Sequence, residues 1–131
     1  MRRKTILDLK TAKKIAIAAE KEAASHDWEV VIAVVDDGGH LLYLQRDKAQ
    51  VGSVDVAIKK ARSAALFRRS TRQWVEKIES GSPGHMAMPA IMPVEGGLPL
   101  VYRDEVIGAI GVSGVQAHED GIIAAAGAAV L

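Results

Sequence analysis

The spacing of apolar residues changes several times along the chain, and each spacing predicts a different element. Between Leu7 and about Ser25, alanines and aliphatic residues recur every three or four positions among lysines and glutamates, which predicts an amphipathic helix. Residues 28–36 form a nearly continuous β-branched run that ends in Asp-Asp-Gly-Gly, after which a second apolar segment begins. The two segments predict a β-hairpin with its turn at residues 37–39.

Helical spacing returns after Ser53. We expect Ser53 to cap a second helix that extends to about Arg69, because Asp55 follows in the first turn and arginines lie near the end. A shorter helix is expected at residues 71–79. The next stretch, HMAMPAIMPVEGG, has too many prolines for a long helix and is too apolar for a solvated loop. We therefore expect it to fold over the rest of the protein.

The last third of the chain predicts a second hairpin and a final helix. Residues 98–102 and 106–113 are apolar runs on either side of Arg-Asp-Glu, and an alanine-rich helix is expected from there to the final residue. Gly108, Gly111 and Gly114 recur every third residue in and just after the second run. A phosphate-binding loop would cluster its glycines between a strand and a helix, so we interpret these glycines as places of close approach to a buried strand.

Two hairpins separated by helices favour a single α+β domain over residues 1–131, with a mainly antiparallel sheet. The 131 residues include 17 basic and 16 acidic side chains, a formal charge of +1, which disfavours nucleic acids and acidic membranes as partners. The absence of cysteine excludes disulfides and thiolate catalysis. No apolar run typical of an export signal follows the basic N-terminus, so the expected compartment is the cytoplasm.

Charged residues near the first hairpin and the second helix are candidates for chemistry. Asp36 and Asp37 could form an acid–base pair, but neighbours on a strand face opposite sides, and aspartate before Gly-Gly is typical of a turn, which we prefer. Arg46 and Lys60 are candidates to hold an acidic ligand. No serine lies in a recognisable pattern with histidine and a carboxylate, so covalent hydrolysis is disfavoured and the catalytic residues, if there are any, are unknown.

The start of the final helix offers a second candidate site. His118, Glu119 and Asp120 are adjacent, and helix residues at such spacing do not face each other, so we interpret the acidic pair as a helix cap rather than as metal ligands. No spacing in the sequence predicts a metal site. The backbone N–H groups of Ser113, Gly114 and the residues after them are expected to point at an anion near the positive end of this helix.

The proline-rich stretch contains His85 and three of the four methionines of the chain. A histidine or a thioether in this stretch could ligate haem iron. The alternative is a flexible cover in which methionines only fill space.

Several motifs together resemble the GlcG/HbpS family, which also includes the C-terminal domain of PduO-type proteins. The motifs are VVDDGGHLLYLQR, KKARSAA, EGGLPL and EVIGAIGVSG followed by HED, and the resemblance extends from about residue 7 to the C-terminus. It implies a profilin-like α+β domain with a five-stranded antiparallel sheet flanked by helices, assembled as a homo-oligomer. It also implies haem or related tetrapyrrole binding, as in some members, or a link to glycolate or diol metabolism, as in others.

The resemblance carries over to individual residues. Val115 stands where the family has a second glycine, Glu119 and Asp120 replace a Gln-Asp pair, and Arg72 lies where PduO-type domains have a haem-associated histidine. His85 is then the first axial-ligand candidate, and His118 the second. The candidate ligand contacts are Asp36, Gly38, Gly39, Arg46, Lys60, Gly96, Gly97, Ser113, Gly114, His118 and Asp120.

We therefore expect a small-ligand or cofactor-binding protein, with haem or another tetrapyrrole as the leading ligand. One alternative is an enzyme or accessory factor acting on a small hydroxy- or carbonyl-acid, with Arg46 or Lys60 holding the carboxylate and Asp36 or His118 moving a proton. Another is a purely structural oligomer. The final segment carries no charge after Asp120, so we expect it to pack against further copies of this chain. The other expected partner is the small-molecule ligand.

Overall fold

The protein has four α-helices, a short 3₁₀ helix and four β-strands, and the computed structural model describes all of residues 1–131. The elements in chain order are α1 (Leu9–Ser25), β1 (Val31–Asp36), β2 (Leu41–Gln45), α2 (Ser53–Phe67), α3 (Arg72–Glu79), η1 (Pro83–Ala87), β3 (Gly97–Tyr102), β4 (Glu105–Ser113) and α4 (Ala117–Ala128). Both predicted hairpins and all four predicted helices are confirmed. None of the helices combines the length and the hydrophobicity that a membrane-spanning helix needs.

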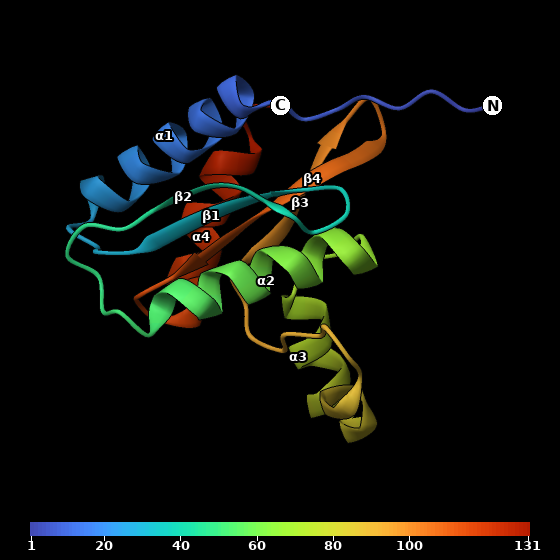
Figure 1. Cartoon of the computed structure of the whole chain (residues 1–131). Helices are drawn as coiled ribbons and strands as arrows, with labels where there is room; N and C mark the ends of the chain where they lie inside the picture. Colours follow the sequence, from blue (N-terminus) through green and yellow to red (C-terminus); the bar gives the residue numbers. More distant parts are fainter.

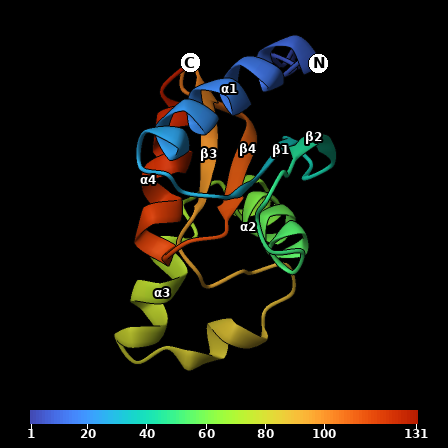
Figure 2. The ribbon, with the colours of Figure 1, turned by 90° about the vertical axis from the view of Figure 1, so that its left-hand side faces the viewer.

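The strands form one antiparallel sheet in the order β2-β1-β4-β3 (Figure 1). Helices α1 and α4 cover one face, and α2 covers the other (Figure 2). The α+β class is confirmed, but the implied fifth strand is not present. The longest stretch without an α-helix or a strand, residues 80–96, contains three prolines, which have no N–H to donate to a strand ladder.

Helix α2 packs directly on the sheet because glycines lie beneath it. Gly97 on β3 and Gly111 on β4 are paired across the strands. A Cβ at Gly111 would collide with the carbonyl of Ala57, and one at Gly97 with the carbonyl of Lys60, both in the backbone of α2. Gly108 similarly lies against the carbonyl of Val35. The predicted close approach to the glycine strand is therefore confirmed, and what approaches is the protein's own backbone.

Two helices begin or end at other residues than the sequence predicts. Ser53 is the first residue of α2 rather than its cap; Gly52 is the cap, and no side chain bonds to the helix start. The Ser53 hydroxyl is buried and accepts a hydrogen bond from the side-chain amide of Gln50 instead, at 3.1 Å. Helix α4 ends at Ala128, before the final residues of the chain.

Residues 72–95, which we call the arm, extend away from the remainder of the protein, the body (Figures 1 and 2). Thr71 and Gly97 close its base, because the Thr71 N–H donates to the Gly97 carbonyl and the Gly97 N–H donates to the Thr71 hydroxyl, each at 3.0 Å. Trp74 is the one fully buried residue of the arm. The proline-rich stretch thus approaches the body where residues 90–92 lie near α2 and where the Glu95 side chain lies against Gly121 of α4.

Candidate functional site

Lys60 and Asp120, both predicted ligand contacts, form a buried ion pair. Lys60 Nζ lies 2.9 Å from Asp120 Oδ2 and donates to the Val112 carbonyl at 2.9 Å, and the two side chains are 1% and 3% exposed. Asp120 Oδ1 also accepts from the N–H of Val115 at 3.2 Å. Gly96 closes over the pair with a φ of +131°, and a Cβ there would lie 2.9 Å from Lys60 Nζ.

The Lys60–Asp120 pair connects α2, β4 and α4 inside the protein. Burial raises the pKa of Asp120, and the neighbouring Lys60 ammonium only partly opposes this shift. Each charge has hydrogen-bonding partners from the chain itself, and almost no surface of either side chain reaches solvent. This geometry is typical of a structural ion pair and does not suit a group that binds and releases a ligand.

The start of α4 is largely occupied by the protein's own carboxylates. Besides the Val115 N–H bound to Asp120, the Gln116 N–H donates to Glu119 Oε1 at 3.1 Å, in a capping box. The cap interpretation is confirmed for Glu119, whereas Asp120 pairs with Lys60. An external anion at this helix end would compete with both carboxylates for the same N–H groups.

The first hairpin turn is held by Asp36. Its Oδ1 accepts hydrogen bonds from the N–H groups of Gly38 and His40, each at 2.9 Å. Partial burial raises the pKa of Asp36, but these hydrogen bonds outweigh burial and leave the pKa below its ordinary value. The turn interpretation is confirmed. Arg46, beyond the other end of β2, donates to the Ala49 carbonyl at 3.1 Å.

The two histidine candidates for haem lie in different surroundings. His85 is half-buried on the arm, with its ring centroid 5.5 Å from that of Trp74 and its Nδ1 3.0 Å from the Ser82 carbonyl. His118 is exposed on the first turn of α4. Histidine, aspartate and glutamate side chains nowhere gather in a group of three that could hold a metal ion.

The structure has four cavities, and none of the predicted contact residues lines any of them. That these residues contact a ligand stays a prediction. Three of the cavities are lined by one or more carboxylates. The fourth, of about 470 Å³, lies between α2 and the arm and is lined by Lys59, Arg62, Ala90, Ile91 and Met92. We call it the arm cavity.

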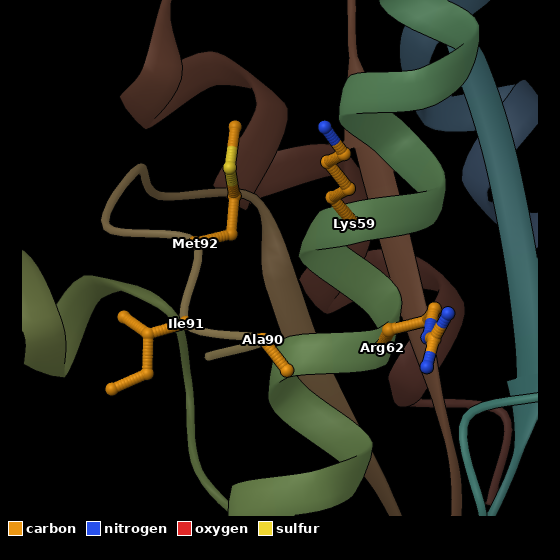
Figure 3. Close-up of a pocket in the computed structure, with 5 residues that line it drawn as sticks. All are labelled: Lys59, Arg62, Ala90, Ile91 and Met92. Carbon is orange, nitrogen blue, oxygen red and sulfur yellow. The ribbon is translucent and has the colours of Figure 1, made fainter. Parts of the chain in front are cut away.

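The arm cavity combines positive charge with an apolar wall (Figure 3). Lys59 extends from α2 on the side facing Met92, whereas Arg62 extends toward the opposite side of the helix, where its Nε lies close to Gly39. Neither cation has an ion-pair partner within the chain. A cavity with an unpaired cation, no carboxylate and apolar side chains suits an anionic, partly apolar ligand.

Sequence reasoning missed Lys59 and Arg62 as site residues, although a signal was present. Both lie at exposed positions of α2, and no acidic residue occurs between Asp55 and Glu76 to neutralise them. Lys60, which was singled out instead, is in phase with the buried alanines of α2. A charged residue on an apolar helix face predicts a buried partner, and Asp120, equally in phase with the buried residues of α4, supplies it.

One known protein family matches nearly the whole chain. The family described as "Haem degrading protein HbpS-like" matches residues 7–129. The chain belongs to this family. Protein GlcG of Escherichia coli K12 is 42% identical over 115 residues, which cover 86% of this chain and 85% of GlcG. The predicted family is thereby confirmed.

Solved structures show the same fold. The crystal structure of a double mutant of Streptomyces reticuli HbpS superposes with a TM-score of 0.91 at 32% identity, covering 100% of this chain and 90% of that one. The PduOC:haem complex superposes with a TM-score of 0.87 at 23% identity, covering 97% and 96% of the two chains. At that identity the PduOC likeness concerns the fold alone.

Proposed function

We propose that this HbpS-like protein binds an anionic, partly apolar ligand in the arm cavity, and that haem is the leading candidate. The observation that carries the proposal is the lining of this cavity, in which the unpaired Lys59 ammonium lies on the side facing Met92, beside an apolar wall and with no carboxylate. Its volume of about 470 Å³ lies within the range of known ligand pockets, roughly 300–1,000 Å³. The family's description and the haem complex of a protein with this fold support haem as the candidate.

The residues of the arm cavity suit the chemical parts of haem. Lys59 would pair with a propionate, Ala90 would contact the apolar macrocycle, and the Met92 thioether is the one iron-ligating type among the lining residues. When bound, haem would supply an iron centre whose properties depend on its axial ligand. His85 remains the alternative ligand from the same arm, although it lies outside the cavity.

Titration with hemin tests this proposal. We expect a sharpened Soret band that saturates at a fixed ratio per chain. Met92→Leu should shift the band and weaken binding, whereas Met86→Leu should change neither, because Met86 lies on the same arm but is 62% exposed and does not line the cavity. Lys59→Gln should weaken binding about fivefold, as expected for one exposed ion pair, with Lys13→Gln on α1 as its control.

The titration also has outcomes that contradict the proposal. A broad change that does not saturate would reject haem. Saturable binding that is altered by His85→Gln and not by Met92→Leu would move the axial ligand to His85 and out of the arm cavity.

The second candidate ligand is a small hydroxy- or carbonyl-acid, bound or turned over. Lys59 favours it, since this cation is accessible, whereas Lys60 is buried against Asp120 and Arg46 is engaged by the Ala49 carbonyl. Thermal shift with glycolate-like acids separates the two ligands. A small acid should raise the melting temperature in the wild type and in Met92→Leu but not in Lys59→Gln, whereas haem binding should depend on both residues.

We also propose that the chain forms a homo-oligomer through the outer face of α4. Ile122, Ala125 and Ala129 are exposed along this face, which has no charged residue after Asp120. Light scattering at micromolar concentrations should give a mass above that of one chain, and Ile122→Lys should reduce it. A monomeric mass for the wild type would contradict the proposal.

A further inference from the structure

The arm forms one wall of the arm cavity. A single hydrogen bond, to a side chain of α2, joins this wall to the helix. Ser63 lies one helical turn beyond Lys59 and is completely buried. Its Oγ accepts a hydrogen bond from the N–H of Met92 at 3.2 Å. Ser63 therefore joins the helix that provides the cations to the residue that provides the thioether.

No other hydrogen bond of residues 88–95 reaches the body. Pro89 and Pro93 have no N–H to donate. The N–H of Ile91 donates to the Met88 carbonyl and that of Val94 to the Met92 carbonyl, so both bonds stay within the arm. The next attachment along the chain is at the base of the arm, where the Gly96 carbonyl accepts from Val112. The Ser63 hydroxyl thus makes the one hydrogen bond between residues 88–95 and α2.

We propose that Ser63 is a positioning residue of the ligand site, which sets the separation between the Met92 side chain and Lys59. The inference rests on the proposed use of the arm cavity. Ser63 is buried behind the wall rather than exposed in the cavity, so it acts through Met92 and does not touch the ligand. Without its hydroxyl, the Met92 N–H loses its acceptor, and the wall no longer has a fixed position.

Ser53 provides a matched control on the same helix. Both serines are buried, and each hydroxyl accepts one hydrogen bond, from Gln50 at 3.1 Å for Ser53 and from Met92 at 3.2 Å for Ser63. The Ser53 bond lies at the start of α2 and does not involve the arm. Ser53→Ala and Ser63→Ala thus remove similar interactions, and only the second concerns the cavity.

The experiment combines hydrogen exchange without ligand and hemin titration. Ser63→Ala should speed amide exchange across residues 88–95 and weaken hemin binding about five- to tenfold, as expected for one lost buried hydrogen bond. Ser53→Ala should do neither, even if it lowers the melting temperature as much. Ser63→Cys, nearly the same size and a weaker acceptor, should give intermediate values and keeps the test usable if Ser63→Ala folds poorly.

Two results would overturn the inference. One is exchange in residues 88–95 that responds to Ser63→Ala no more than to Ser53→Ala. The other is faster exchange with unchanged hemin affinity and an unchanged Soret band. Failure of the proposed function is distinguishable, because hemin binding would then be absent or unaffected by Met92→Leu and Lys59→Gln, while the exchange data would still report whether Ser63 holds the wall.

Discussion

The body and the arm of this protein are built in opposite ways. In the body, strands β1 and β4 are almost wholly buried, and α2 lies so close to the sheet that glycine is required beneath it. In the arm, Trp74 alone is fully buried, against Phe67 at 5.4 Å and beneath the guanidinium of Arg69 at 4.9 Å. A densely packed body has little freedom to change shape, whereas an arm with a small apolar cluster can be adjusted around a ligand.

The same contrast distinguishes the predicted ligand contacts from the residues that line the arm cavity. Lys60, Gly96, Gly97 and Asp120 are buried at the junction of the body elements. The residues that line the accessible cationic cavity come from the outer side of α2 and from the arm. The predicted contact residues thus account for much of the fold, whereas the proposed ligand site depends on Lys59, a neighbouring residue of the KKARSAA motif, and on residues of the arm.

Breaking the buried ion pair should have the largest effect on the body. Lys60→Met leaves the Asp120 carboxylate buried without its partner, which costs about 3–5 kcal/mol in free energy of unfolding. The neighbouring Lys59→Met, on the exposed side of α2, should cost far less. Denaturant unfolding of the two variants measures the difference, and equal losses would show that the pair has no special structural role.

The same variant has an expected pH dependence. Burial raises the pKa of Asp120 above its ordinary value of 3.8, so its contribution to stability is fully present below pH 3.8 and is lost as the pH rises through the raised pKa. Removing Lys60 strengthens this effect. The deficit of Lys60→Met relative to the wild type should therefore grow from acidic to neutral pH.

The next largest effect is expected where α2 rests on the sheet. Gly111→Val introduces side-chain atoms against the Ala57 carbonyl and should cost at least about 1–3 kcal/mol. Gly84 on the arm has no atom within 4 Å of a would-be Cβ, so Gly84→Val should leave the melting temperature nearly unchanged. Similar melting temperatures for the two variants would contradict the contrast between body and arm.

A tryptophan in each region allows the arm to be disturbed alone. Trp74→Ala removes the centre of the arm cluster and should loosen the backbone of α3, so that trypsin cleaves faster at the already exposed Lys77, with only a small change in global melting temperature. Trp28→Ala, in the body, should lower the melting temperature without increasing cleavage at Lys77. Unfolding of the whole protein by Trp74→Ala would mean that the arm is part of the main cooperative unit.

The smallest effect is expected at the first hairpin turn. Because hydrogen bonds keep the pKa of Asp36 below 3.8, the ionised carboxylate stabilises the fold above pH 3.8, and this contribution is lost as the pH falls through the lowered pKa. Asp36→Asn should lower stability by about 1 kcal/mol near neutral pH. The difference from the wild type should shrink on acidification, and a constant difference between pH 2 and 7 would contradict the assignment.

The periodicity of apolar residues predicts the helices and strands of the body, but it does not predict the contacts that join them. Helices and hairpins were predicted because their buried faces repeat at 3.6 or at two residues, and the glycine strand because its glycines interrupt a buried run. Ser53 was wrongly expected to cap α2, because sequence does not show that Gln50 engages its hydroxyl. The Lys60–Asp120 pair joins residues 60 positions apart and needed the three-dimensional fold to be seen.

The arm was the least predictable region. Its prolines excluded long regular elements, but its direction depends on the contacts at Thr71 and Gly97, which lie far apart in the sequence. The arm cavity depends in turn on the Ser63–Met92 hydrogen bond, between segments that no local pattern connects. Only the missing acidic residues between Asp55 and Glu76 pointed to unpaired charge on α2.

Hydrogen exchange with and without saturating hemin tests most directly the claim that the ligand binds between α2 and the arm. The account predicts slower exchange in residues 88–95 and in the turn of α2 around Lys59 to Ser63, with little change elsewhere in the body. Slower exchange at the first hairpin turn or at Ser113 to Asp120, with none in residues 88–95, would contradict it and place the ligand at the predicted contact residues of those two segments instead.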